Sequence, residues 1–534
     1  MRRLLPRLAI GLGAMAAGCA LDSSGALGTG GTGGAGGDTG SDGGTCLPGE
    51  SATCYSGPAD TLRGSCRSGT RSCIAGAWGA CEGEVLPASE DCVAPADEDC
   101  DGLAPPCQSW ARVLADPGAG AVHATAIDAR GRALITGWVQ GQFDFGGGPQ
   151  ATSGVDALLL RLDAAGVFAA VQSFGDGKVQ LGQSVAVGAD GAVILGGRFR
   201  GAIFGDANQL VSEGQSNLFV ARFGSDGVLA WTRAIGSLFN DDGIALALDS
   251  SSRTVVAANV AGPSLVHLTP LGHAGSIDVV LASLDATGAV LWANVYGDVE
   301  NQTMNAMAVA PGDDVVVVGS MRGTLDTGSG PMVAVGGSDG FVARVRSDGI
   351  GYWSHSFGGS GDEAATAVAV VPGGGLCVAG SFASVSDFGG GSVAPAGQRD
   401  AFVLKMGASG KLHWARRIGG EGVDVGAAVA AGPDGGCIVG GSFEGTALAE
   451  TTELVSSGAS DGFLVRYDVA GKLVFARAFG GRGDQAVSTL TSDAAGGLLV
   501  GGQASVSVDL GDGTAPTIIN GESDAFLVRL TPPG

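Results

Sequence analysis

Short apolar runs bounded by glycine and aspartate recur along most of this chain. One run occurs seven times, and its copies start 61 residues apart except for a last interval of 63. A fixed period of this size is typical of a stacked or closed array of similar supersecondary units. The copies are DALLLRL from Asp156, NLFVARF from Asn217, DVVLASL from Asp278, DGFVARV from Asp339, DAFVLKM from Asp400, DGFLVRY from Asp461 and DAFLVRL from Asp524.

Each period divides into four predicted strands. Between Glu363 and Gly419 these strands are EAATAVAVV, LCVAGSF, DAFVLKM and HWARRIG. The runs favour β-structure and are bounded by turn residues, and two of the connections are short enough for hairpins. Four antiparallel strands per unit predict a propeller blade.

The two ends of the array predict how it closes. The sequence WARVL from Trp110 matches the fourth strand of other units, whereas the last unit, Gln485 to Leu530, contains only the first three. Pairing of the N-terminal strand with the last blade would remove two open sheet edges. We therefore predict an all-β, seven-bladed propeller of four-stranded antiparallel blades. An open solenoid is the alternative.

The repeat also resembles a known family. The stretch FGGSGDEAATAVAVVPGGGLCVAGSFASVSDFGG, from Phe357 to Gly390, is similar to the bacterial β-propeller repeat family of exported proteins. The resemblance extends over residues 110–532. It implies a propeller fold, and it implies no shared reaction or catalytic residue, because this family is defined by its fold.

The N-terminus predicts export. MRRLLPRLAIGLGAMAAGC combines a basic start, a short apolar stretch and small residues before Cys19. It resembles a bacterial lipoprotein signal, which implies lipidation of Cys19, although Ala16 stands where leucine is commonest. An ordinary signal peptide is the alternative. We expect a signal peptide (1–19), a Gly-rich tether (20–45), a Cys-rich module (46–107) and the propeller (108–534), located in the cell envelope and lipid-anchored to the outer membrane or cell surface.

The Cys-rich module contains eight of the eleven cysteines. A dense, even set in an exported chain predicts a disulfide framework whose pairing the sequence does not define. The spacings are too wide for the paired CxxC ligands of a zinc site. The eight are Cys46, Cys54, Cys66, Cys73, Cys81, Cys92, Cys100 and Cys107.

An acidic run, EDCVAPADEDCDG, lies within this module. Asp97, Asp99 and Asp101 supply hard oxygen ligands of the kind that bind calcium, so calcium is a candidate cofactor. The module resembles Cys-rich regions with a metal-binding motif in myxobacterial surface proteins, although Val93 interrupts the first copy of the C-D-G pattern. A solvated acidic turn held by disulfides is the alternative.

The net charge of the chain limits the classes of partner that it is expected to bind. The chain has 29 basic and 53 acidic residues, a formal net charge of −24, which would repel nucleic acid but leaves cations, basic proteins and glycans as partners. Acids recur in the loops that join the fourth strand of one unit to the first strand of the next, which predicts an acidic ring on one face of the propeller. Turn-forming preference is the alternative explanation. The predicted ligand-face acids are Asp176, Asp241, Asp242, Asp298, Glu300, Asp362, Glu363, Glu421, Asp424 and Asp484.

Other chemistry-bearing residues favour packing. Cys377 and Cys437 lie in second strands of adjacent units, 60 rather than 61 residues apart, so they should point to opposite strand faces and remain free thiols. Aligned tryptophans occupy one position of the predicted fourth strand, where other units have Ala170 or Phe475, which favours packing between blades over a sugar-stacking ring. These tryptophans are Trp231, Trp292, Trp353 and Trp414.

One loop departs from the pattern. Residues 263–275 lack the usual Asp-and-Gly sequence and carry His267, Pro270 and His273, so this is where we expect specificity. The five histidines are scattered over several units without a nucleophile motif nearby, and we expect no catalytic residues. We therefore predict a monomeric surface scaffold that binds a protein or a glycan. The alternatives are a polysaccharide-acting enzyme, which would need paired carboxylates, and a purely structural envelope protein.

Overall fold

The structure is a computed structural model that describes residues 46–57, 66–86, 107–114, 119–266, 269–493, 495–510, 517–518 and 524–531. The predicted signal peptide with Cys19, the tether, Cys92, Cys100, His267 and the acids Asp97, Asp99 and Asp101 lie outside the described residues. The chain divides into a large unit containing residues 109–529 and a small unit containing residues 46–86.

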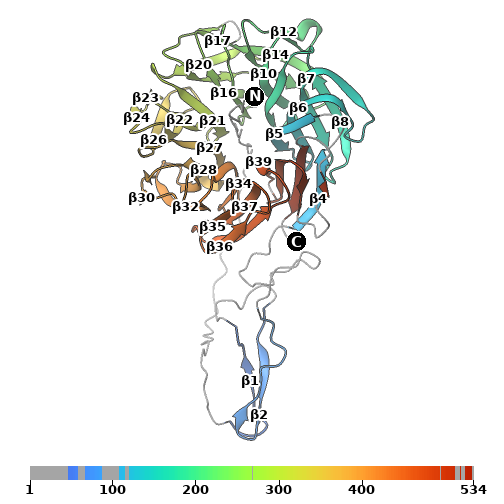
Figure 1. Ribbon diagram of the computed structural model, residues 1–534, viewed down its shortest axis with the longest axis vertical. Helices are drawn as coiled ribbons and strands as arrows, with labels where there is room; N and C mark the ends of the chain where they lie inside the picture. The colour runs from blue at the N-terminus through green and yellow to red at the C-terminus, as the bar shows by residue number, and fades with distance from the viewer. Residues whose placement is uncertain are drawn as a thin grey trace, which may run out of the picture. The chain divides into compact units, whose positions relative to one another are not determined.

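The large unit is the predicted all-β propeller of four-stranded antiparallel blades (Figure 1). The described residues contain seven such sheets, and two of them are extended to six strands. Blade 1 consists of β5 (Ala119–Ile127), β6 (Ala133–Phe143), β7 (Gln150–Leu162) and β8 (Phe168–Phe174). Blade 2 consists of β9 (Gln180–Val187), β10 (Val193–Phe199), β13 (Asn217–Phe223) and β14 (Leu229–Gly236). Blade 3 consists of β15 (Ile244–Leu248), β16 (Thr254–Val260), β19 (Asp278–Leu284) and β20 (Val290–Tyr296).

The remaining blades follow the same order. Blade 4 consists of β21 (Gln302–Val309), β22 (Val315–Met321), β25 (Asp339–Val345) and β26 (Gly351–Phe357). Blade 5 consists of β27 (Glu363–Val370), β28 (Leu376–Phe382), β31 (Asp400–Met406) and β32 (Leu412–Gly420). Blade 6 consists of β33 (Val425–Ala431), β34 (Cys437–Phe443), β37 (Asp461–Tyr467) and β38 (Leu473–Phe479). Blade 7 consists of β39 (Gln485–Ser492), β40 (Leu498–Ala504), β43 (Asp524–Thr531) and β4 (Cys107–Leu114).

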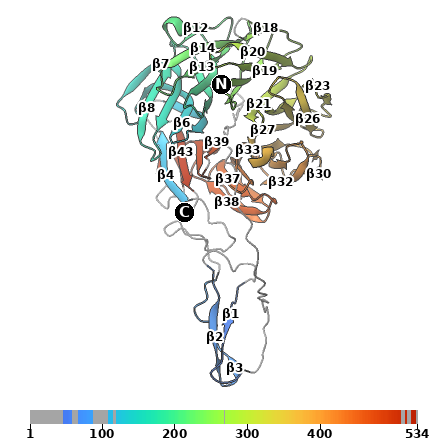
Figure 2. The same cartoon turned by 180° about the vertical axis from the view of Figure 1, so that it is seen from behind.

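The fourth strand of blade 7 comes from the start of the propeller sequence. The sheet order is β39-β40-β43-β4, and β4 lies beside β43 in Figure 2. First strands contact one another in the cycle β5, β9, β15, β21, β27, β33, β39 and back to β5. Apolar core forms between successive blades rather than within them, as in the cluster that joins Leu158 of blade 1 to Leu499 and Leu527 of blade 7.

Small hairpins connect the second and third strands of the blades. Two of them pair with the fourth strand of the preceding blade and cover its open edge, which protects that edge from pairing with another chain. These two are β17 (Ser264–Val266) with β18 (Thr269–Leu271), and β35 (Thr446–Ala449) with β36 (Thr452–Val455). The others are β11 (Ala202–Ile203) with β12 (Leu210–Val211), β23 (Thr324–Asp326) with β24 (Pro331–Val333), β29 (Ser386–Asp387) with β30 (Ser392–Val393), and β41 (Ser507–Val508) with β42 (Thr517–Ile518).

A β-bulge recurs in the first strand and links neighbouring blades. The bulged residue falls out of register with the second strand, so its side chain is redirected. His123 Nδ1 lies 2.8 Å from the Gly182 carbonyl, Asn305 Nδ2 donates to the Ala365 carbonyl (2.8 Å), and Ser488 Oγ donates to the Val122 carbonyl (3.3 Å). Each of these contacts reaches the next blade, so the bulges form hydrogen bonds around the inner strands.

Helix is confined, in the described residues, to the 3-10 turns η2 (Asp206–Asn208) and η3 (Pro372–Gly374), neither of which could span a bilayer. The small unit contains a three-stranded sheet of β1 (Ser51–Cys54), β2 (Gly69–Ile74) and β3 (Ala77–Trp78). Disulfides join Cys46 to Cys73 and Cys54 to Cys81, and Cys66 is also disulfide-bonded. So short a sheet has little core, and such cross-links supply stability that burial does not.

Candidate functional site

One face of the propeller carries nearly identical turns, and we call it the short-turn face. It consists of the turns between first and second strands and between third and fourth strands. In each turn the first residue donates its N–H to the carbonyl of the fifth residue, and the fourth donates to the carbonyl of the first. The turns are residues 128–132, 163–167, 188–192, 224–228, 249–253, 285–289, 310–314, 346–350, 371–375, 407–411, 432–436, 468–472 and 493–497.

The opposite face is the long-loop face, and its loops differ from blade to blade. It consists of the loops from the fourth strand to the next first strand and the loops from the second to the third strand. Parallel bridges join the two kinds of loop, for example Ser216 with Asn240 and Ser338 with Asp362. In the described residues, the first kind are 175–179, 237–243, 297–301, 358–362, 421–424 and 480–484, and the second kind are 144–149, 200–216, 261–266 with 269–277, 322–338, 383–399, 444–460 and 505–510 with 517–518.

Three of the ten predicted ligand-face acids are buried. Asp241, Glu363 and Asp424 have no exposed surface. Each stands at or just before the start of a first strand and accepts hydrogen bonds from its own loop, as when Gly420 N–H donates to Asp424 Oδ2 (2.8 Å). The prediction of surface acids is therefore wrong for these three. Their position in the loop is as expected, but the side chains turn inward between blades.

Asp176 and Asp298 organise loops. Gln180 Nε2 donates to Asp176 Oδ1 (2.6 Å), and Ala202 N–H donates to Asp176 Oδ2 (2.6 Å). Asp298 accepts equivalent bonds from Gln302 Nε2 (2.7 Å) and Thr324 N–H (2.6 Å). Burial opposes ionisation of both carboxyls, but these hydrogen bonds outweigh it and lower the pKa of Asp176 and of Asp298.

The other predicted acids lie nearer the surface. Asp242 pairs with Arg198 (2.8 Å), and Asp362 pairs with Arg322 (3.4 Å). Glu300, Glu421 and Asp484 are exposed. The acids that can meet a ligand thus form separate points on the long-loop face, several of them already paired, rather than one continuous ring.

The most regular polar feature of the propeller is a buried pair of side chains at six of the junctions between blades. The aspartate or asparagine that begins a third strand lies beside the acid or amide that begins the next first strand. A Cβ on the glycine at the end of the intervening fourth strand would overlap both members of four of these pairs, and at Gly358 and Gly480 it would overlap the aspartate. The pairs are Asp156 with Gln180, Asn217 with Asp241, Asp278 with Gln302, Asp339 with Glu363, Asp400 with Asp424, and Asp461 with Gln485.

Sequence reasoning missed these pairs, although all six follow the 61-residue period. In the two pairs that contain two acids, like charge and burial discourage ionisation. Burial is the larger cause and the Asp400 carboxylate adds to it, so that the pKa of Asp424 rises to about 6. Burial likewise raises the pKa of Asp339, and Glu363 contributes. Because these groups are sealed between blades, they serve the fold and do not meet a surface ligand.

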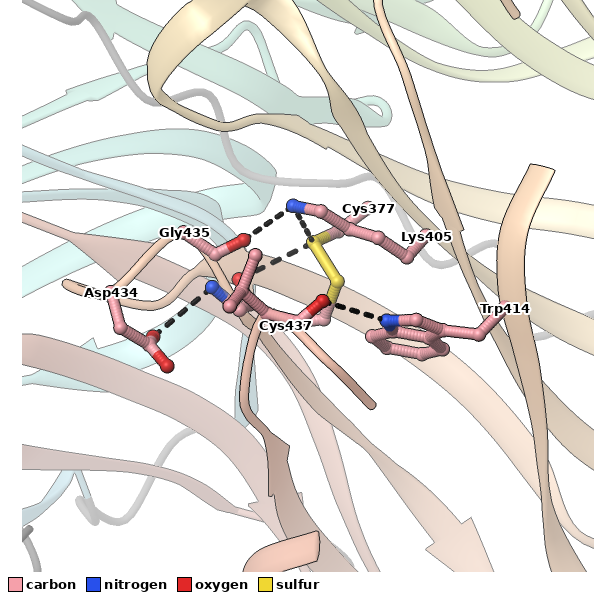
Figure 3. Close-up of a disulfide and its surroundings, with 8 residues drawn as sticks. Cys377, Lys405, Trp414, Asp434, Gly435 and Cys437 are labelled. Atoms are coloured by element: carbon pink, nitrogen blue, oxygen red, sulfur yellow. Dashed lines mark hydrogen bonds between the residues drawn. A yellow bond between two sulfur atoms is a disulfide. The ribbon is translucent and has the colours of Figure 1, made fainter. Parts of the chain in front are cut away.

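Cys377 and Cys437 form a disulfide between blades 5 and 6 (Figure 3). The prediction of free thiols is therefore wrong. The one-residue offset does place the two cysteines on opposite faces of equivalent strands, but opposite faces of adjacent blades are the ones that meet. At the junction of blades 4 and 5 the equivalent positions are Val316 and Leu376, which belong to one apolar cluster.

Lys405 lies beside this disulfide. Its buried ammonium donates to the Gly435 carbonyl and is 3.9 Å from Cys377 Sγ. Burial lowers the pKa of Lys405 to about 8, and the carboxylate of Asp434 opposes this shift. Four other blades have arginine at this position, paired with an aspartate of their own first turn, whereas the first turn of blade 5 is Pro-Gly-Gly-Gly and offers no acid.

The aligned tryptophans pack between blades, as predicted. Each indole Nε1–H donates to a carbonyl in the turn between the third and fourth strands of the next blade. The bonds run from Trp110 to Ala164 (3.1 Å), Trp231 to Ala286 (2.9 Å), Trp292 to Ser347 (2.9 Å), Trp353 to Ala408 (3.1 Å) and Trp414 to Val469 (3.1 Å).

The deviant loop contributes the β17–β18 hairpin and His273. The His273 Nδ1 atom lies 3.0 Å from Oδ2 of Asp278, whose side chain is fully buried. Burial raises the pKa of the Asp241 carboxyl, and the charge of His273 opposes this rise. His273 is therefore an imidazole placed beside carboxylates on the long-loop face. The described residues contain no group of three or more His, Cys, Asp or Glu side chains able to hold a metal ion.

The sequence matches no protein-family model and no curated protein. Similar solved structures include the WD40 domain of Pan2 from Neurospora crassa (10% identity, TM-score 0.39, 79% of this chain and 94% of that chain). They also include Sqt1 from Chaetomium thermophilum (10% identity, TM-score 0.37, 79% and 100%) and the polysaccharide lyase Uly1 (9% identity, TM-score 0.39, 85% and 94%). At these values the likenesses say nothing about activity.

Proposed function

We propose that this chain is an exported, lipid-anchored scaffold that binds a protein or a glycan through its long-loop face, without catalysis. The observation that carries the proposal is the contrast between the two faces. The short-turn face repeats one backbone turn, whereas the loops of the long-loop face differ in sequence and charge, and two of their hairpins join the sheet of the preceding blade while the other described hairpins form separate sheets. Variable loops on a rigid framework are where binding specificity resides in many folds.

The chemistry of the long-loop face supports a binding role. Exposed acids stand near exposed apolar side chains, and Phe239 lies against Gly262 of the deviant loop. Mixed apolar and acidic surface fits a partner that presents basic and apolar groups. The exposed large apolar residues in the described parts of these loops are Val179, Val211, Leu238, Phe239, Leu265, Val299, Val333, Val335, Val385, Leu448, Val455 and Val506.

The proposed location follows from the sequence of the first 45 residues. Lipidation of Cys19 would anchor the chain, and the Gly-rich segment to residue 45 would hold the folded units off the membrane by roughly 25–30 Å. The resemblance to exported repeat proteins supports this location. Globomycin treatment, which blocks lipoprotein signal cleavage, should cause the uncleaved precursor to accumulate if Cys19 is the lipidated residue.

The binding proposal is tested by exchanging loops. Residues 261–277 are replaced by the equivalent segment 322–338 of blade 4, and a control exchanges the short turn 346–350 for 285–289. Binding of the mature chain to arrays of surface polysaccharides and basic proteins is then measured by biolayer interferometry. We expect the loop exchange to weaken binding at least tenfold and the turn exchange to leave it unchanged. Equal effects of the two exchanges would contradict the proposal.

A polysaccharide-acting enzyme is the second candidate, favoured by one observation. His273 lies on the long-loop face with its Nδ1 atom 3.0 Å from the buried carboxylate of Asp278, and an imidazole held in this way can transfer protons. If the chain releases reducing ends from polysaccharides and His273→Ala abolishes that release, the enzymatic reading replaces the scaffold.

A further inference from the structure

A cavity of about 130 Å³ opens between blades 1 and 2, on the side of the short-turn face. Arg132, Arg161 and Ala169 of blade 1 line one side of it. Val193, Ser225 and Gly227 of blade 2 line the other. A space of roughly this size accommodates one aromatic ring in a protein interior.

The cavity coincides with a missing tryptophan. In blade 2, Trp231 pairs across the strands with Arg222, and its indole fills the junction with blade 3. In blade 1 the residue paired with Arg161 is Ala170. Ser225 lines the cavity and is the equivalent, one repeat earlier, of Ala286. The Ala286 carbonyl accepts the indole N–H of Trp231. The indoles at the other junctions thus indicate that a flat aromatic ring fits the cavity between blades 1 and 2.

The cavity also contains a guanidinium without an acidic partner among the described residues. Arginines at the position of Arg161 pair with aspartates in blades 2, 4, 6 and 7, for example Arg344 with Asp314 (2.9 Å). In blade 1 the candidate acid, Asp128, is engaged by Arg132 (2.6 Å). Burial and the charge of Arg132 both lower the pKa of Arg161, consistent with an uncompensated cation.

We propose that this cavity binds a small aromatic carboxylate. Its ring would occupy the place that indoles fill at the other junctions, and its carboxylate would pair with Arg161, whose planar fork suits bidentate contact with two oxygens. Asp226 also lines the cavity, with Oδ1 already accepting the Val228 N–H (3.0 Å), and it disfavours a second anionic group on the ligand. The site lies on the face opposite the proposed binding surface and does not depend on it.

The experiment uses the mature chain and three probes: benzoate, benzyl alcohol and inorganic phosphate. Saturation-transfer NMR detects contact, and calorimetry measures affinity. Benzoate should bind at least tenfold more tightly than either the neutral ring or phosphate, because only benzoate satisfies both the cavity and Arg161. Equal binding of benzyl alcohol, tighter binding of phosphate, or no binding of benzoate would overturn the proposal.

Two variants separate the site from nonspecific effects. Arg161→Gln should weaken benzoate binding at least tenfold and leave benzyl alcohol unchanged. Ala170→Trp introduces the residue found in five of the other six blades, so it should abolish benzoate binding while raising Tm, an outcome that loss of folding cannot mimic. Benzoate binding that survives Ala170→Trp in a folded protein would place the ligand elsewhere and overturn the assignment.

Discussion

The two faces of the propeller are held together in different ways. On the short-turn face the backbone of each turn bonds to itself, and aspartates such as Asp468 reinforce the turn by accepting N–H groups of Ala470 and Lys472 (both 2.8 Å). On the long-loop side, buried side-chain pairs such as Asp278 with Gln302 hold the loops. Backbone turns tolerate identical repetition, whereas side-chain pairs allow each junction to differ. Backbone turns therefore make the short-turn face uniform, and buried side-chain pairs permit the long-loop face to vary above the same strands.

The largest expected effect concerns the Cys377–Cys437 disulfide, a covalent link between side chains on the short-turn side. Replacing both cysteines with serine should lower the free energy of unfolding by about 4 kcal/mol, because the cross-link closes a span of 60 residues. Denaturant unfolding under non-reducing conditions measures this change.

A matched variant separates the cross-link from packing. Cys377→Val with Cys437→Leu copies Val316 and Leu376 of the preceding junction, so we expect it to recover about half of the loss. If the serine variant is as stable as wild type, the cross-link contributes nothing and this junction is held like its neighbours.

The next effect tests the side-chain pairs of the long-loop side. Gly297→Ala should destabilise the propeller by about 2–3 kcal/mol, because the new methyl group would overlap Asp278 and Gln302. Gly312→Ala is the control: it lies in a short turn with φ of +86° and no atom near its Cβ, so backbone strain alone should cost about 1 kcal/mol. Thermal and urea unfolding give both values, and equal losses would mean that the buried pair does not constrain the junction.

The smallest effect depends on pH. The pKa of Asp424 is about 6 in the folded state and 3.8 when exposed. Its protonated form therefore favours folding below pH 4, and this contribution is lost as pH rises through 6. Asp424→Asn removes the titration, so its stability relative to wild type should improve by about 1–2 kcal/mol from pH 4 to pH 7.5, allowing for solvent screening. Unfolding curves at several pH values measure it, and a constant difference would show that Asp424 ionises normally.

The strands and blades could be predicted from the sequence because each 61-residue repeat folds into the same backbone unit. EAATAVAVV became β27 and DAFVLKM became β31, and the tryptophans pack between blades as expected. The same reasoning failed for Asp241, Glu363 and Asp424, because position in a loop does not reveal which way a side chain turns. It failed for Cys377 and Cys437 because it considered each strand's faces without the contact between blades.

Other features were visible in the sequence but needed the structure to be interpreted. The substitution of Ala170 for tryptophan is plain in the alignment of repeats, yet only the junction with blade 2 shows that it leaves a cavity beside an arginine without an acidic partner in the described chain. Conversely, the metal ligands predicted at Asp97, Asp99 and Asp101 lie outside the described residues and stay a prediction.

The sheet order β39-β40-β43-β4 also determines when blade 7 can form during synthesis of the chain. The first propeller strand to be made shares its sheet with the last strand, so blade 7 is assembled only after the remainder of the propeller has been produced. Contacts between such distant segments form late and slowly. Until then β4 is a strand without its partner, and the nascent chain depends on chaperones or on rapid completion to avoid pairing with a neighbour.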